Sequence, residues 1–62
     1  MKIKEVEECL QVPRATIRFY EKEGLINPKK GENGYREYSD HDILILKKII
    51  VLRKLGFSVA DI

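Results

Sequence analysis

Apolar positions recur at helical spacing near the N-terminus and again after a proline. The first set comprises Ile3, Val6, Cys9 and Leu10. This spacing predicts a helix over residues 3–10. Val12 precedes a proline and is pushed out of the helical region, so the helix ends before it. A second helix is expected over residues 13–23, because Pro13 is tolerated in a first turn and Gly24 suits a C-cap.

The polar stretch after the second helix has the pattern of a small hairpin. It contains Asn33-Gly34, a strong short-range hairpin signal. After it, the alternation expected of a strand runs through Tyr35, Arg36, Glu37 and Tyr38. Pro28 limits the preceding strand to an edge position. The pattern therefore predicts a two-stranded wing over residues 27–38.

The last third of the chain predicts a long helix and the beginning of another. Ser39 and Asp42 match a capping box, and the helix that they start ends near Leu55. This helix is apolar almost all round, which is typical of a helix buried on most sides. Ser58 and Asp61 repeat the capping pattern for a fourth helix. We therefore expect either that residues 1–62 are one N-terminal domain of a longer protein or that a partner covers the third helix.

Composition restricts the class of protein without deciding it. The 62 residues are 44% hydrophobic and 35% charged, which fits one small globular domain and excludes a disordered chain. No apolar run is long enough to cross a membrane, and the N-terminus lacks the apolar stretch of a signal peptide. The single cysteine cannot form an internal disulfide, which favours a protein of the reducing cytoplasm.

Positive charge is concentrated in the middle of the chain. The net charge is only +2, but residues 9–36 hold six cations and three anions. Such a segment is a weak indication of a polyanionic partner, and an ordinary solvated charged surface is the competing interpretation.

The predicted order of helix, turn, helix, hairpin and helix is that of a mainly α winged helix-turn-helix. In this motif the second helix enters the major groove of DNA. Arg14 and Arg18 lie one turn apart, opposite the side on which Pro13, Ile17 and Tyr20 are expected to anchor the helix. An arginine can meet a guanine edge or a phosphate with paired hydrogen bonds. An amphipathic helix with a solvated basic face explains the same pattern.

The predicted wing carries matching chemistry. Arg36 suits the narrow minor groove, and Lys29 and Lys30 add attraction to the DNA backbone. Tyr35 and Tyr38 can donate hydrogen bonds to phosphates. For Tyr38, pinning the hairpin to the core is an equally good explanation.

Three segments in order resemble the N-terminal DNA-binding domain of the MerR family of bacterial transcription regulators. They are ATIRFYEKEGLINP at 15–28, ENGYREYSDHDI at 32–43 and LRKLGFSVADI at 52–62. The resemblance implies a homodimer, formed through a coiled-coil helix beyond residue 62, that binds double-stranded palindromic promoter DNA. Family members typically distort the promoter so that RNA polymerase can use an overlong spacer, under control of a following effector domain.

The resemblance also implies specific DNA contacts. They fall on Arg14, Arg18 and Tyr20 in the recognition helix, and on Lys30, Tyr35, Arg36 and Tyr38 in the wing.

Three positions depart from the family pattern. Lys2 replaces a capping Ser or Thr, Glu7 a small residue and Gln11 a turn glycine. A glutamate buried unpaired at a helix contact is costly, so Glu7 is expected to reach solvent or to shift the first helix.

Other classes of protein are less well supported by the sequence. His41 and Cys9 fall on different elements, where a surface histidine and a small core cysteine are the simplest interpretations. No nucleophile motif, P-loop or metal-ligand spacing is present, so neither an enzyme nor a bound cofactor or metal is expected. Two alternatives stay open: an excisionase-like recombination directionality factor, and an antirepressor-like module whose third helix docks a partner protein.

Overall fold

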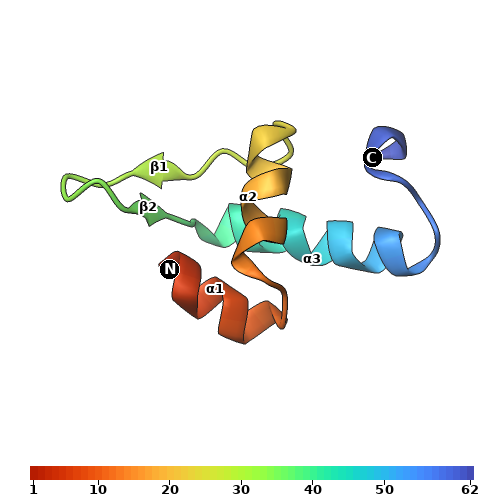
Figure 1. The fold of residues 1–62 in the computed structure, drawn as a ribbon, viewed down its shortest axis with the longest axis horizontal. Coiled ribbons are helices and arrows are strands. Elements are labelled where there is room, and N and C mark those ends of the chain that lie inside the picture. Colours follow the sequence, from red (N-terminus) through yellow and green to blue (C-terminus); the bar gives the residue numbers. More distant parts are fainter.

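The computed structural model describes all 62 residues, and its elements follow the predicted order. The elements are α1 (Ile3–Leu10), α2 (Arg14–Lys22), β1 (Lys29–Lys30), β2 (Arg36–Glu37), α3 (Asp40–Lys54) and a 3₁₀ turn, η1 (Val59–Asp61) (Figure 1). The fold is mainly helical with one two-stranded antiparallel hairpin, which confirms the winged helix-turn-helix prediction. The hairpin and the C-terminal half of α3 extend in opposite directions (Figure 1). This gives the chain an elongated shape of 37 × 21 × 19 Å.

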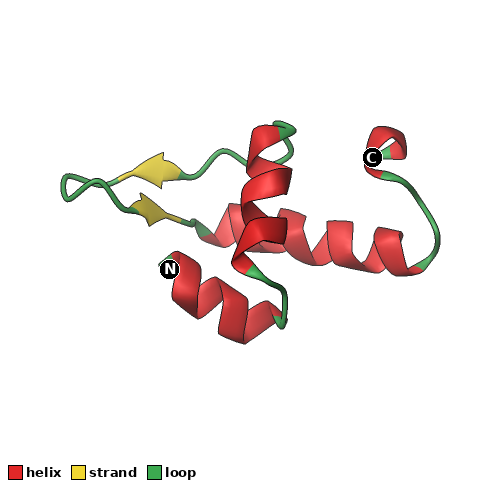
Figure 2. Cartoon of the chain, in the orientation of Figure 1, coloured by secondary structure: helices red, strands yellow, loops and turns green.

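The turn between α1 and α2 depends on one unusual backbone conformation. Gln11 has φ +58°, in the left-handed region that favours glycine. Its side-chain amide donates a hydrogen bond of 2.9 Å to the carbonyl of Glu8, at the end of α1. Pro13 is extended and exposed just before α2, so the expectation that it anchors this helix is wrong. The short connection holds the two helices at an angle (Figure 2).

Gly24 ends α2 as predicted. It has φ +79°, and the next amide, of Leu25, donates back to the carbonyl of Tyr20 at 3.0 Å. This backward bond satisfies a carbonyl that would otherwise be unpaired at the helix end. The turn directs the chain inward, where Ile26 is 3% exposed.

The core joins all three helices to the base of the wing. Its buried apolar residues are Val6, Ile17, Tyr20, Ile26, Tyr38, Ile43, Leu46 and Ile49. Ile3 and Leu10 pack against this cluster and, with Val6, define the inner side of α1. Cys9 lies off this stripe and is exposed, so its prediction as a core residue is wrong.

The third helix is buried only over its first half. Ser39 and Asp42 form the predicted capping box, through bonds of 2.9 and 3.1 Å. Beyond Ile49 the helix leaves the rest of the chain, and Val51 and Leu55 are 56% and 70% exposed. The predicted burial on most sides is therefore not reached within these 62 residues. The predicted fourth helix is limited to the single turn η1.

The wing is shorter than its sequence pattern. Lys29 pairs with Glu37 and Lys30 with Arg36 in antiparallel register. Beyond these pairs, the amide of Gly31 donates to the carbonyl of Tyr35 at 2.7 Å, which encloses a three-residue loop. Gly34 ends this loop with φ +83°. The combination of a turn and a left-handed glycine is one of the common hairpin connections.

Candidate nucleic-acid interface

The N-terminal residues hold the base of the wing. The backbone amide of Tyr38 donates to the carbonyl of Met1 at 2.8 Å, and the Met1 ammonium donates to the carbonyl of Tyr38 at 3.0 Å. The carboxylate of Glu37 contacts the Met1 ammonium and the Lys2 ammonium, each at 2.9 Å. Hydrogen bonds from these two ammonium groups lower the pKa of Glu37. The start of α1 is thereby held beside the wing.

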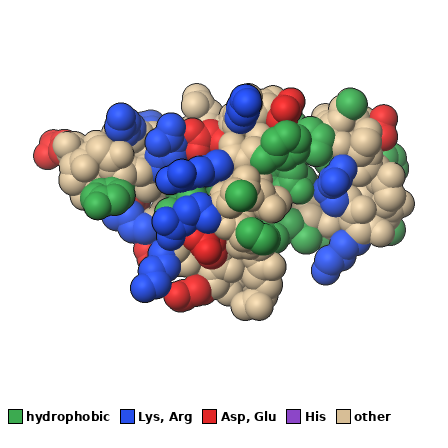
Figure 3. Space-filling model, viewed as in Figure 1, with side chains coloured by type: hydrophobic (Ala, Val, Ile, Leu, Met, Phe, Trp, Pro, Cys, Tyr) green, Lys and Arg blue, Asp and Glu red, His purple; other side chains and the backbone are tan.

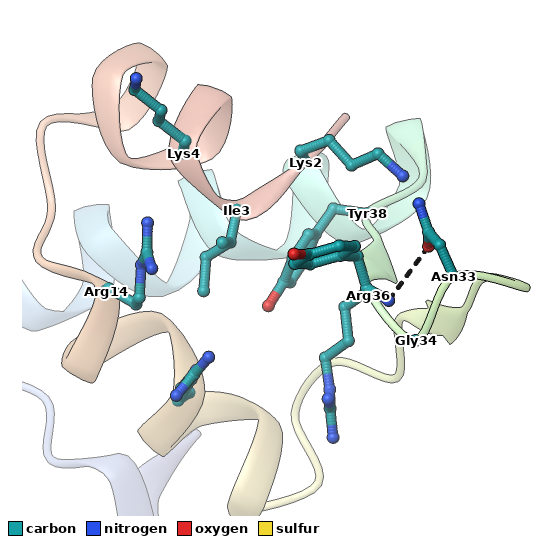
Figure 4. Close-up of a pocket in the computed structure, with 10 residues that line it drawn as sticks. Lys2, Ile3, Lys4, Arg14, Asn33, Gly34, Arg36 and Tyr38 are labelled. Carbon is teal, nitrogen blue, oxygen red and sulfur yellow. Dashed lines mark hydrogen bonds between the residues drawn. The ribbon is translucent and has the colours of Figure 1, made fainter.

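A hollow of about 470 Å³ opens between the start of α1, the exposed side of α2 and the wing. Five cationic residues contribute to its lining: Lys2, Lys4, Arg14, Arg18 and Arg36. Figure 4 shows residues of all three elements around it, although the ammonium group of Lys4 points away from its centre, and no carboxylate lines it. Lys and Arg side chains gather on this face of the molecule (Figure 3). A concave surface lined by one sign of charge concentrates anions.

Five of the seven predicted contact residues line this hollow. They are Arg14, Arg18, Tyr35, Arg36 and Tyr38. Lys30 is exposed on β1, opposite Arg36, outside the hollow. Tyr20 is only 6% exposed, so its ring belongs to the core and its predicted role as a DNA contact has little free surface to act through.

Lys2 and Lys4 also line the hollow, although the sequence pattern did not indicate them as contacts. They belong to an N-terminal segment in which glutamates outnumber lysines, so composition gave no signal. Their position depends on the pairing of Met1 with Tyr38, which is remote in sequence. The one sequence feature that set Lys2 apart was its position, where the family usually has a capping Ser or Thr.

Two of the three arginines in the hollow are held by glutamates. Arg14 Nε lies 2.6 Å from Glu7 Oε1, and Arg36 Nε lies 2.5 Å from Glu21 Oε2. The first pair links α1 to α2, and the second links α2 to the wing. Glu7 is partly exposed and paired, so the predicted cost of an unpaired buried carboxylate does not arise. Arg18 has no ion-pair partner.

A second, smaller hollow of about 340 Å³ extends the charged surface. It is lined by Arg18, Glu21, Lys22 and Arg36. Because Arg18 and Arg36 line both hollows, the cationic face runs along α2 to the wing.

Tyr38 supplies an unpaired polar group to the main hollow. The residue is 1% exposed, and its hydroxyl has no hydrogen-bond partner in the protein. Burial, followed by the nearby Glu21 carboxylate, raises the pKa of Tyr38 above its ordinary value. The hydroxyl is itself buried, so it can donate to a phosphate only after the side chains that cover it have moved.

Comparison with known proteins identifies a shared domain. Residues 1–62 match the family described as "MerR HTH family regulatory protein". The chain is 46% identical, over 98% of its length, to HTH-type transcriptional regulator HmrR of Rhizobium leguminosarum bv. viciae, of which it covers 47%. It is 34% identical, over 98% of its length, to CueR of Escherichia coli O157:H7, of which it covers 46%. The chain thus spans about half the length of these curated relatives.

A solved structure has the same arrangement. The structure is titled "Crystal structure of HiNmlR, a MerR family regulator lacking the sensor domain, bound to promoter DNA". It superposes with a TM-score of 0.89 and 32% identity, over 98% of this chain and 47% of that one. These matches favour the regulator over the excisionase-like and antirepressor-like alternatives.

No helix has both the length and the apolar character needed to span a bilayer. No group of three or more His, Cys, Asp and Glu side chains is placed to hold a metal ion.

Proposed function

Because the chain belongs to the MerR family of helix-turn-helix transcription regulators, we propose that it binds double-stranded promoter DNA through the hollow between α1, α2 and the wing. The observation that carries the proposal is the presence of five cationic residues, and of no carboxylate, in the lining of one concave surface. Phosphate contacts dominate the affinity of DNA-binding proteins, and they require such a surface.

Within this proposal, α2 and the wing have different tasks. Arg14 and Arg18 stand one turn apart near the N-terminal end of α2, the part of a recognition helix that meets base edges. Arg36 and Tyr35 follow the backbone or enter the adjacent minor groove, and Lys30 attracts phosphates from the outer side of the wing. Tyr20 can contact DNA only through its hydroxyl, because its ring is buried in the core.

The oligomeric state and the cellular location of the whole protein are also inferred from the family. We expect the whole protein to act in the bacterial cytoplasm as a homodimer, joined by a helix beyond residue 62, on a palindromic site. RNA polymerase is then an indirect partner, through the shape of the promoter. No catalytic role is proposed for any residue.

Fluorescence anisotropy with a labelled duplex tests the proposal. The logarithm of affinity should fall linearly with the logarithm of salt concentration, with a slope of about −0.9 for each phosphate contacted. Arg18→Ala should weaken binding and relax sequence preference, since a good base contact contributes about 1–3 kcal/mol. Arg53→Ala, which removes an exposed cation at the far end of α3, is the matched control. Equal losses in the two variants would contradict an interface centred on the hollow.

A further inference from the structure

Glu7 and Arg14 form a contact whose geometry leaves most of the arginine free. The carboxylate oxygen Oε1 of Glu7 accepts a hydrogen bond from Arg14 Nε at 2.6 Å. No protein acceptor engages the two terminal nitrogens of this guanidinium. An end-on guanidinium uses these terminal nitrogens to meet O6 and N7 of guanine together. The carboxylate therefore holds the inner edge of the group and leaves its outer edge available.

The position of the pair suits this task. Glu7 lies on α1, seven residues before Arg14, and the side chains are 30% and 49% exposed. Arg14 is the first residue of α2 and lines the cationic hollow. A free arginine has several rotatable bonds, and fixing them on binding costs conformational entropy. A carboxylate that already fixes the guanidinium reduces this cost for one orientation only.

We propose that Glu7 is a positioning residue that orients Arg14 for base recognition and so raises sequence discrimination. The proposal rests on the DNA-binding function proposed above and adds to it a residue that does not itself touch DNA. It differs from electrostatic competition, in which Glu7 would merely occupy Arg14 and weaken binding to every sequence. Competition predicts that removing the carboxylate increases affinity without loss of discrimination.

The chain offers a closely matched control. Glu8 is the next residue of α1, is exposed, and has no ion pair or side-chain hydrogen bond. Glu7→Gln and Glu8→Gln therefore change the net charge by the same amount on the same helix. Their nonspecific attraction to DNA should rise similarly, so any difference between them reports the contact with Arg14.

The experiment first selects a preferred duplex from a random pool with the full wild-type chain. Affinities of each variant are then measured for this duplex and for a shuffled duplex of equal composition. We expect Glu7→Gln to lower the ratio of the two affinities at least about threefold, a fraction of the discrimination that a base-contacting arginine provides. Glu8→Gln should leave the ratio unchanged. In an Arg14→Ala background, Glu7→Gln should have no further effect on the ratio.

An NMR measurement without DNA tests the contact itself. The Nε–H signal of Arg14 should shift between wild type and Glu7→Gln and stay in place in Glu8→Gln. An unchanged signal in Glu7→Gln, or equal affinity ratios in the two glutamine variants, would overturn the inference while leaving the proposed function intact. Failure of the wild-type chain to bind duplex DNA in a salt-dependent way would instead overturn the proposed function, and this inference with it.

Discussion

Replacing Tyr38 by phenylalanine is expected to raise stability and weaken DNA binding at the same time. The change removes one oxygen from a side chain that is 1% exposed and leaves its ring in the core. That hydroxyl has no hydrogen-bond partner in the protein. An unsatisfied buried hydroxyl costs about 1–3 kcal/mol, and phenylalanine avoids this cost without opening a cavity. The free energy of unfolding should therefore increase by about 1 kcal/mol or more.

The effect on DNA should have the opposite sign. The hydroxyl is buried next to the hollow lined by Arg14, Arg18 and Arg36, so DNA has to displace the side chains that cover it before a phosphate can accept its hydrogen bond. A hydrogen bond to a charged group contributes about 1.5–3 kcal/mol, so loss of a phosphate contact should weaken binding roughly tenfold to a hundredfold. If Tyr38 had a purely structural role, its replacement would not raise the free energy of unfolding while lowering the affinity for DNA.

Urea unfolding followed by circular dichroism gives the stability, and anisotropy with a duplex gives the affinity. Tyr35→Phe is the control, because Tyr35 is 68% exposed and its hydroxyl is free to contact water. Its stability should stay within about 0.5 kcal/mol of wild type. A Tyr38→Phe variant that is less stable than wild type would refute the reasoning, since its hydroxyl would then have a stabilising partner in solution. Unchanged affinity would remove Tyr38 from the interface.

Other variants test the fold and its charges. Gly24→Ala should destabilise by roughly 1–2 kcal/mol in thermal unfolding, because φ is +79° there and no atom blocks the added methyl group; an unchanged midpoint would contradict this strain. Leu46→Ala removes a fully buried side chain and should cost about 2–5 kcal/mol, and a smaller loss in urea would mean that the core closes around the gap. Bonds from Ser58 lower the pKa of Asp61, so its support of η1 is complete above about pH 4 and is lost as acid protonates the folded carboxylate. The Ser58 amide signal should follow this titration, and Asp61→Asn should abolish its pH dependence.

Features that depend on a few neighbouring residues were predictable from the sequence. The capping box of Ser39 and Asp42 and the C-cap at Gly24 use backbone groups within one helical turn. The hairpin signal of Asn33-Gly34 likewise concerns one local turn. For such elements the sequence determines the conformation before tertiary packing contributes.

Features that depend on how elements cross were not predictable in the same way. Helical spacing made Ile3, Val6, Cys9 and Leu10 candidates for the core, but the packing of α1 buries only the side formed by Ile3, Val6 and Leu10 and leaves Cys9 exposed. The contact of Glu7 with Arg14 spans the turn at Gln11, so its existence depends on that left-handed residue. The sequence showed these charges but not their pairing.

The wing has too little internal structure to set its own position. Each strand has two residues, and an isolated two-stranded hairpin is marginally stable at best. Its direction depends on contacts outside the hairpin, namely the backbone pair of Met1 with Tyr38 and the ion pair of Arg36 with Glu21. Arg36 is therefore both a proposed DNA contact and a link between the wing and α2. A phosphate that attracts Arg36 also acts on the contact that orients the wing, so wing position and DNA binding are coupled through this one side chain.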